Sequence, residues 1–181
     1  DRRFLSKEAM QWAAMVFAAE GIHTKLINKS VPTPLVMFYV MKHDYQYGMM
    51  ITASHNPAIY NGVKVFTYGG RDADEKQTME IVQFINEVTD LPVNEMDYQK
   101  ALEAGLIEEI YPLNEYLDSI IAAVDMEAIR EAGLRVALDP MYGVSETSIK
   151  TVLMTARCEV ETIHERHDTL FGGKLPAPTA D

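Results

Sequence analysis

The sequence predicts an α/β protein in which helices are layered on mixed, largely parallel sheets. Of the 181 residues, 48% are hydrophobic, which is ample for a packed core. Short apolar runs suited to strands alternate with longer stretches whose apolar residues recur at helical spacing. Glycines, prolines and an Asn-Gly pair stand between these stretches, where turns are needed. Alternation of this kind is typical of layered α/β domains.

The first part of the chain is expected to form a β-α-β unit between two further helices. Ser6 is the candidate N-cap of the first helix, while Thr33 and Pro34 fit the start of the second. Asp72 and Glu75 have the spacing of a capping pair for the third helix. The expected elements are helices at 6–21, 33–43 and 75–88 and strands at 22–27, 48–53 and 63–66.

The pattern weakens between residues 91 and 112, where we expect polar connection and one short strand, "LIEEIY". We place a domain boundary near 112, which divides the chain into domains 1–112 and 113–181. The second domain is expected to contain helical segments over 113–133, a strand and a helix over 134–154, and a loop-like tail. The chain begins at a helix and stops in a loop, so we expect two incomplete domains and a longer parent chain.

Composition excludes several classes of function. The formal net charge of −11 opposes general affinity for DNA or RNA but leaves room for a small phosphorylated ligand. No apolar run approaches the roughly 20 residues that span a bilayer, and the charged start does not suit a signal peptide. The single cysteine, Cys158, cannot form an internal disulfide and is expected to be buried in a strand. These features suit a cytoplasmic protein.

The segment "GMMITASHNPAIYNGVKVF" is the candidate site. Ser54, His55, Asn56 and Pro57 interrupt an apolar run, and these are ordinary loop residues as well as chemically useful ones. The loop is expected at the carboxyl end of a strand, where ligands bind in open α/β sheets. The next strand would bring Lys64 back toward the same pocket.

Three chemistries use a serine at such a place. A hydrolase needs a histidine base across space and an oriented acid, but His55 is only a neighbour in sequence and no G-x-S-x-G elbow surrounds Ser54. A phosphate-cradling loop needs the Walker glycine pattern, which is absent. The third is a serine that itself carries a phosphoryl group, balanced by a divalent cation and cationic side chains.

The stretch "TASHNPAIYNGVKV" resembles the phosphoserine loop of the α-D-phosphohexomutases, the superfamily of phosphoglucomutases and phosphomannomutases. Other segments resemble this family in the same order along nearly the whole chain. These are "DRRFLS" for the end of its Gly-x-Asp-x-Arg strand, "SVPTPLVMF" for its Thr-Pro segment, "LRVALDPMYG" for the opening of domain two, and "HDTLFGGKLPAPT" for the segment before its metal loop.

The resemblance implies a mutase that interconverts hexose 1-phosphate and hexose 6-phosphate, with glucose preferred. Ser54 would carry the phosphoryl group and pass it through a bound hexose 1,6-bisphosphate, which also serves as activator. Lys64 matches the general acid/base lysine, although a solvated lysine on an edge strand has the same appearance. His55 would contact the phosphate or shuttle protons, or it would only structure the loop.

The resemblance also implies substrate-binding roles for Arg3 and Asn61. Arg3 would orient the phosphoserine loop or the substrate, or would simply pair with Asp1. Asn61 with Gly62 most simply makes a tight turn. Mg²⁺ is implied as cofactor, with the phosphate on Ser54 as one ligand and the remaining ligands expected beyond residue 181.

The departures from the family bear on activity. The Asp-Gly-Asp-Ala-Asp-Arg type metal loop is absent from the 181 residues, and we interpret Asp72 and Asp74 as helix-start acids. His164, His167 and Asp168 are closely spaced but lie in a segment that the family does not use for metal. We therefore expect this polypeptide alone to be inactive. Phosphomannomutase, phosphoglucosamine mutase and a non-catalytic binding or scaffold module remain alternatives, and the oligomeric state is not readable.

Overall fold

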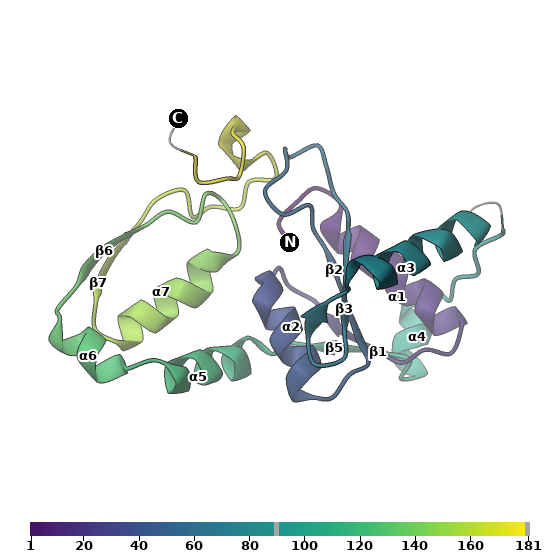
Figure 1. Ribbon diagram of the computed structural model, residues 1–181, viewed down its shortest axis with the longest axis horizontal. Helices are drawn as coiled ribbons and strands as arrows, with labels where there is room; N and C mark the ends of the chain where they lie inside the picture. Colours follow the sequence, from purple (N-terminus) through teal and green to yellow (C-terminus); the bar gives the residue numbers. More distant parts are fainter. Residues whose placement is uncertain (89–90, 180–181) are drawn as a thin grey trace.

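The computed structural model describes residues 1–88 and 91–179 and shows short strands alternating with helices. Figure 1 shows α5 to α7 with β6 and β7 on one side of the molecule, and the elements before them on the other. The elements are α1 (Ser6–Ala19), β1 (Thr24–Ile27), α2 (Thr33–Lys42), β2 (Tyr47–Ile51), β3 (Val63–Thr67), β4 (Arg71–Asp72), α3 (Glu75–Val88), α4 (Tyr98–Glu103), β5 (Ile107–Ile110), α5 (Leu113–Ala123), α6 (Met126–Glu131), β6 (Arg135–Leu138), α7 (Ser145–Thr155), β7 (Glu159–Thr162) and the 3₁₀ turn η1 (Phe171–Gly173).

The described strands pair in both directions within an α/β fold, as the sequence predicts, but each sheet is purely parallel or purely antiparallel rather than mixed. Strands β1 and β5 are parallel, as are β6 and β7, whereas β2, β3 and β4 form an antiparallel sheet. The expected β-α-β unit is wrong in one respect, because β1 and β2 lie in different sheets of the described residues. The parallel partner of β1 is β5, which comes much later in the chain.

Two apolar clusters form the core among the described residues. One cluster joins α2, β2, β3 and α5, with Leu35 and Phe66 fully buried. The other joins α1, β1, α4 and β5 around Ala18 and Ile107. Leu113 and Leu117 of α5 belong to the first cluster, so the helix that follows the predicted boundary packs into the core that precedes it.

The start of the third helix differs from the prediction. Asp72 lies in β4, and the cap is made by Asp74, whose carboxylate accepts a hydrogen bond from the Gln77 amide at 2.8 Å. The Gln77 side chain accepts one from the Asp74 amide at 3.0 Å, which completes a reciprocal capping box. The antiparallel pairing of Thr67 with Arg71 draws Asp72 into the sheet and away from the helix.

Other local expectations have mixed outcomes. Ser6 is the first helical residue rather than the N-cap, and Pro32 takes the cap position expected for Thr33. The weakly patterned stretch after residue 91 contains an additional helix, α4, capped by Asp97. Cys158 is buried, as expected, but it lies just before β7 rather than within the strand.

Phe66 provides a direct test of the core. Replacing this fully buried side chain in Phe66→Ala should lower the free energy of unfolding by about 3–5 kcal/mol, because transfer energy is lost and a cavity remains. Urea unfolding followed by circular dichroism measures the change. Phe84→Ala, at a side chain that is 65% exposed, is the matched control and should shift stability by only about 0.5 kcal/mol. Equal effects of the two variants would contradict the packing described.

Candidate functional site

The loop between β2 and β3 carries the candidate residues and extends toward the C-terminal segment of the chain (Figure 1). Because β2 and β3 are antiparallel neighbours, with Ile51 opposite Val63, the loop begins and ends at the same edge of their sheet. The position of Ser54 after β2 therefore agrees with the expected strand-end loop. The returning strand, however, runs antiparallel.

Arg3 is the centre of this loop's structure. Its side chain is fully buried, and its Nε donates to the Asp1 carboxylate at 3.2 Å. The guanidinium also stacks on Phe171, with 5.1 Å to the ring centroid. Its two terminal nitrogens donate to four loop carbonyls, those of Ser54 (2.7 Å), Asn56 (2.9 Å), Pro57 (3.0 Å) and Tyr60 (3.0 Å).

A guanidinium has five N–H donors, and these bonds engage all of them. Burial lowers the pKa of Arg3, yet the group starts so basic that it stays charged. The geometry thus supports two of the expected roles, orienting the loop and pairing with Asp1. Because all five N–H groups of Arg3 bond to the protein, none is left to donate to a substrate, as the expected direct contact would require.

A second set of hydrogen bonds, made by Thr52, fixes the start of the loop. The buried hydroxyl of Thr52 donates to the Asp1 carboxylate at 2.6 Å and accepts from the Ser54 amide at 3.1 Å. Asp1 thus accepts hydrogen bonds from both Arg3 and Thr52. Arg3 fixes the loop through its carbonyls, and Thr52 fixes it at its first residue. Sequence reasoning gave Thr52 no role, although it lies in the motif. The signal available in the sequence is a polar residue at the end of an apolar run, two positions before Ser54.

Ser54 is exposed at the loop surface in a left-handed backbone conformation, with φ of 56°. A non-glycine residue in this region is uncommon and persists where surrounding contacts determine it, as the Arg3 and Thr52 bonds do here. The Ser54 hydroxyl lies 3.3 Å from Nδ1 of His55. Among the hydrogen bonds of the described residues, none joins His55 to a carboxylate, so the serine hydrolase triad is not formed.

Lys64 lies in β3, opposite Met50. Its ammonium is 3.7 Å from the Asp72 carboxylate of β4, and its side chain is 42% exposed. No hydrogen bond or ion pair within residues 1–88 and 91–179 joins Lys64 to Ser54. The structure places Lys64 in the strand that returns from the loop, as expected, but it brings His55 rather than Lys64 next to the serine hydroxyl.

Asn61 closes the loop against the start of α1. Its side-chain amide donates to the Phe4 carbonyl at 3.1 Å and to the Ser6 hydroxyl at 2.9 Å. Its side-chain oxygen accepts from the Gly62 amide at 3.0 Å. Gly62 lies close to the other arm of the loop, since an added Cβ would meet the Thr52 carbonyl at 3.3 Å. These bonds agree with the turn interpretation of Asn61 and give it an anchoring role.

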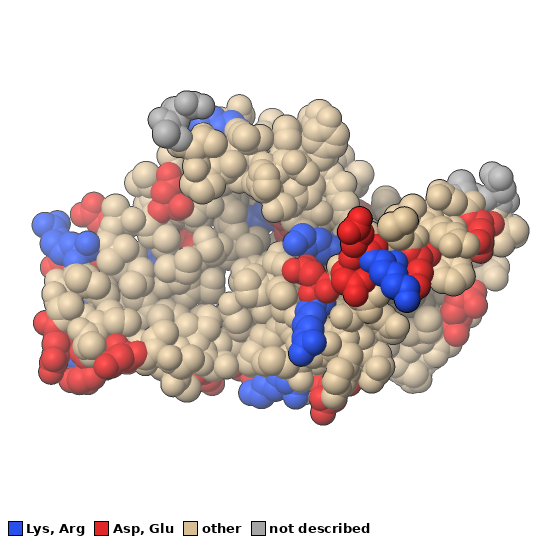
Figure 2. Space-filling view, viewed as in Figure 1, with Lys and Arg blue, Asp and Glu red and all other residues tan. Residues whose placement is uncertain are grey.

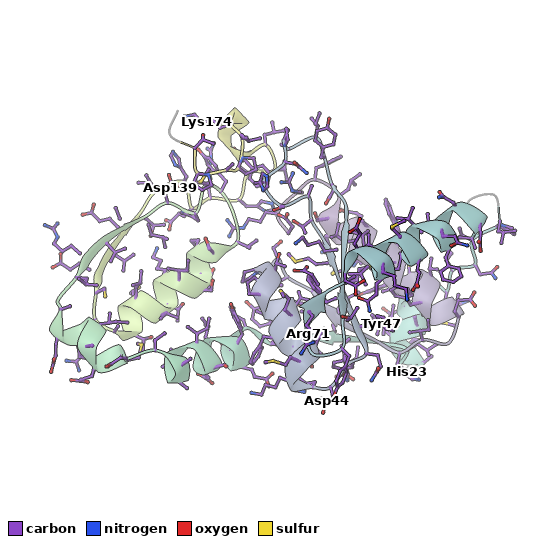
Figure 3. All side chains as sticks on the ribbon, viewed as in Figure 1. His23, Asp44, Tyr47, Arg71, Asp139 and Lys174 are labelled. Atoms are coloured by element: carbon purple, nitrogen blue, oxygen red, sulfur yellow. The ribbon has the colours of Figure 1, made fainter. Side chains whose placement is uncertain are left out.

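The histidines of the C-terminal segment each have a separate partner. His164 bonds the Asp139 carboxylate at 2.9 Å, and this bond is the main reason why the pKa of Asp139 lies below its usual range. His167 bonds the Arg2 carbonyl at 3.1 Å, while Asp168 accepts from the amides that open η1. Figure 3 shows Asp139 at the same end of the molecule as Lys174, away from the β2 to β4 sheet.

Few side chains in the described part of the chain are placed to coordinate a metal ion. Within the described part of the chain, no group of three His, Cys, Asp or Glu side chains is placed to hold a metal ion. Asp1, whose carboxylate lies beneath the loop, is engaged by Arg3 and Thr52. Ser54, the metal ligand expected from the sequence, could contribute only through a phosphoryl oxygen that it carries. These residues do not make a complete Mg²⁺ site.

The visible surface carries charges of both signs. Figure 2 shows Lys and Arg scattered among acidic side chains on the visible face, without a continuous basic patch of the kind that binds nucleic acid. Across residues 1–88 and 91–179, no helix combines the length and apolar character needed to cross a membrane.

Arg3→Gln tests the loop geometry. The variant should lose about 3–5 kcal/mol of unfolding free energy, because the buried loop carbonyls lose their donors and the partly buried Asp1 carboxylate loses its counter-charge. Denaturant unfolding gives the energy, and amide hydrogen exchange over 54–60 should speed up in the same variant. Arg135→Gln, which breaks an exposed ion pair with Glu159, should change stability by less than about 1 kcal/mol. Unchanged exchange in the Arg3 variant would contradict the assigned role.

The chain matches two family models along most of its length. The model described as phosphoglucomutase/phosphomannomutase, alpha/beta/alpha domain I, matches residues 1–91, and the corresponding domain II model matches residues 114–181.

Individual relatives agree with these matches. The chain is 33% identical over 122 residues to a phosphoglucomutase of Staphylococcus haemolyticus, which covers 61% of this chain and 22% of the relative. It is 32% identical over 151 residues to a phosphoglucosamine/phosphogalactosamine mutase of Sulfurisphaera tokodaii, covering 83% of this chain and 32% of that one.

A solved structure of a Thermus thermophilus protein, described as a phosphomannomutase, superposes with a TM-score of 0.85 at 26% identity. The superposition covers 98% of this chain and 39% of the Thermus chain. The chain thus spans well under half the length of each of these three proteins.

Proposed function

The chain belongs to the phosphoglucomutase/phosphomannomutase family, and from this premise we propose that the full-length protein is a phosphohexomutase with Ser54 as its phosphoryl carrier. The observation that carries the proposal is the placement of Ser54, exposed on a loop whose backbone is fixed by a buried guanidinium. The relatives are named as mutases, which supports the reaction class.

The proposed reaction moves a phosphoryl group between Ser54 Oγ and a hexose hydroxyl. The P–O bond to serine breaks as the P–O bond to the sugar forms, and the proton of the sugar hydroxyl passes through an acid/base side chain to the Ser54 oxygen that is released. A bound hexose 1,6-bisphosphate results, and after it reorients, its other phosphoryl group returns to Ser54. Catalysis of such transfer depends mainly on positioning and on stabilising charge, which suits a loop held rigidly from beneath.

Two residues are proposed to transfer the proton of the sugar hydroxyl. His55 is the nearer, with Nδ1 at 3.3 Å from the serine oxygen. Lys64 retains its proposed acid/base role: its amino group must leave Asp72 to reach the sugar, and it takes up the hydroxyl proton in its neutral form. Arg3 and Asn61 are proposed as positioning residues, because their side-chain donors are already engaged with the protein.

The cofactor, the domains and the substrate are further parts of the proposal. Mg²⁺ would neutralise charge on the transferring oxygens, with a phosphoryl oxygen on Ser54 as the ligand from this chain. Residues 1–112 and 113–181 are proposed as parts of the first and second domains. A phosphorylated hexose, with glucose preferred, is the proposed substrate, and phosphomannomutase or phosphoglucosamine mutase activity is the competing specificity.

Ser54→Ala in the full-length protein tests the carrier. Intact mass should show one added phosphoryl group on part of the unsubstituted protein and none on the variant. A coupled assay with added hexose 1,6-bisphosphate measures the conversion of glucose 1-phosphate to glucose 6-phosphate. The rate should fall roughly 10³-fold or more in the variant, because no group remains to carry the phosphoryl. Mannose and glucosamine phosphates in the same assay rank the substrates.

Ser119→Ala, in α5, is the matched serine control and should retain both mass increment and turnover. Retained turnover in Ser54→Ala would refute the carrier role. Absence of both phosphate and turnover in the unsubstituted protein would favour the binding or scaffold module. The 181-residue chain alone should show no conversion above the blank, and measurable turnover by it would overturn that part of the proposal.

A further inference from the structure

A cavity lies where the two halves of the chain meet, apart from the Ser54 loop. Its volume is about 260 Å³. None of its lining residues belongs to the stretch 52–64. They are Arg2, Lys29, Ser30, Pro32, Tyr111, Leu113, Val144, Thr147, Ser148 and His167.

The architecture explains why these residues converge. Lys29 and Ser30 follow β1, and Tyr111 follows β5; since these strands are parallel, their carboxyl ends share one edge. Ligands of open α/β sheets bind at such edges. The first turn of α7 closes the opposite side with Val144 and Thr147, and Figure 1 shows this end of α7 facing the N-terminal segment.

Arg2 and Arg3 serve different sites although they are adjacent. Arg3 is fully engaged by the Ser54 loop and Asp1. Arg2 turns toward the second half of the chain, where it donates to the Glu165 carbonyl at 3.1 Å and pairs with Glu146 at 3.4 Å. These contacts use only part of its guanidinium, so N–H groups remain for a ligand in the cavity.

The charged side chains that line the cavity are basic. Arg2 and Lys29 are cationic, His167 is the third basic side chain, and no carboxylate is among the residues that line the cavity. The Lys29 ammonium lies 4.3 Å from the centroid of the Tyr111 ring, which holds it at the rim. Among the ion pairs of the described residues, none engages Lys29, so its charge is uncompensated there.

The hydroxyl groups do not suit a neutral sugar. Ser30 donates its hydrogen to the Asp1 carbonyl, and Thr147 donates to the Glu146 carboxylate. Ser148 donates to the Ser145 carbonyl. A polyol would therefore find few free donors, whereas an oxyanion would find the ammonium of Lys29 and the remaining N–H groups of Arg2.

We propose that this cavity binds the phosphate group of a small metabolite at a site separate from Ser54. Its volume lies just below the range of about 300–1,000 Å³ typical of drug-sized ligands, which favours a small phosphate ester over a nucleotide. Because both halves of the chain line it, a bound phosphate stabilises their contact. This proposal does not depend on mutase activity.

Calorimetric titration of the 181-residue chain with inorganic phosphate, at constant ionic strength, tests the site. Saturable binding is expected, and Lys29→Gln should weaken it about tenfold or more through loss of a charge-assisted hydrogen bond. Lys29→Arg should restore most of the affinity. Glu146→Gln should tighten binding, because Arg2 is released from its carboxylate. The melting temperature should rise with phosphate in the unsubstituted chain and not in Lys29→Gln.

Two controls separate this site from other sources of binding. Lys76→Gln, a single-charge change on α3 at a side chain that is 84% exposed, should bind phosphate as the unsubstituted chain does. Ser54→Ala should also bind normally, whether or not the proposed mutase function holds. Loss of binding in Ser54→Ala, unchanged binding in Lys29→Gln, or acetate binding as tightly as phosphate would each overturn the proposal.

Discussion

The buried guanidinium of Arg3 is the interaction on which the Ser54 loop depends. A charged side chain with no exposure is stable only when its donors are all engaged and a counter-charge lies beside it. Four loop carbonyls and Asp1 meet both conditions. Because the carbonyls turn inward to reach Arg3, the peptide chain presents the hydroxyl of Ser54 and the ring of His55 to the outside.

The rest of the fold supports this centre from several directions. Thr52 and Asn61 fix the two arms of the loop, one through Asp1 and the other through the start of α1. Phe171, from the far end of the chain, covers the guanidinium. A reactive group held by rigid elements loses little further freedom when it reacts, which is the form of preorganisation that phosphoryl transfer requires.

The sequence predicted the loop well because its motif is long and local, but it predicted tertiary details poorly. The strands around Ser54 follow from nearby apolar runs and turn residues. The prediction of Asp72 as a helix cap is wrong because the pairing of β3 with β4 depends on register, which a capping pattern does not contain. Helix α4 is six residues long and depends on the burial of Ala101. The contact of Lys64 with Asp72 likewise arises only from strand pairing.

The guanidinium protons of Arg3 test this account most directly, by nuclear magnetic resonance of the 181-residue chain. Five separate, slowly exchanging guanidinium N–H signals are expected for Arg3, because each proton has its own acceptor in a buried place. Exposed Arg135, at 78% side-chain exposure, supplies the reference for rapid exchange and averaged signals. Arg3 signals as averaged and as fast in exchange as those of Arg135 would contradict the claim that this side chain holds the loop.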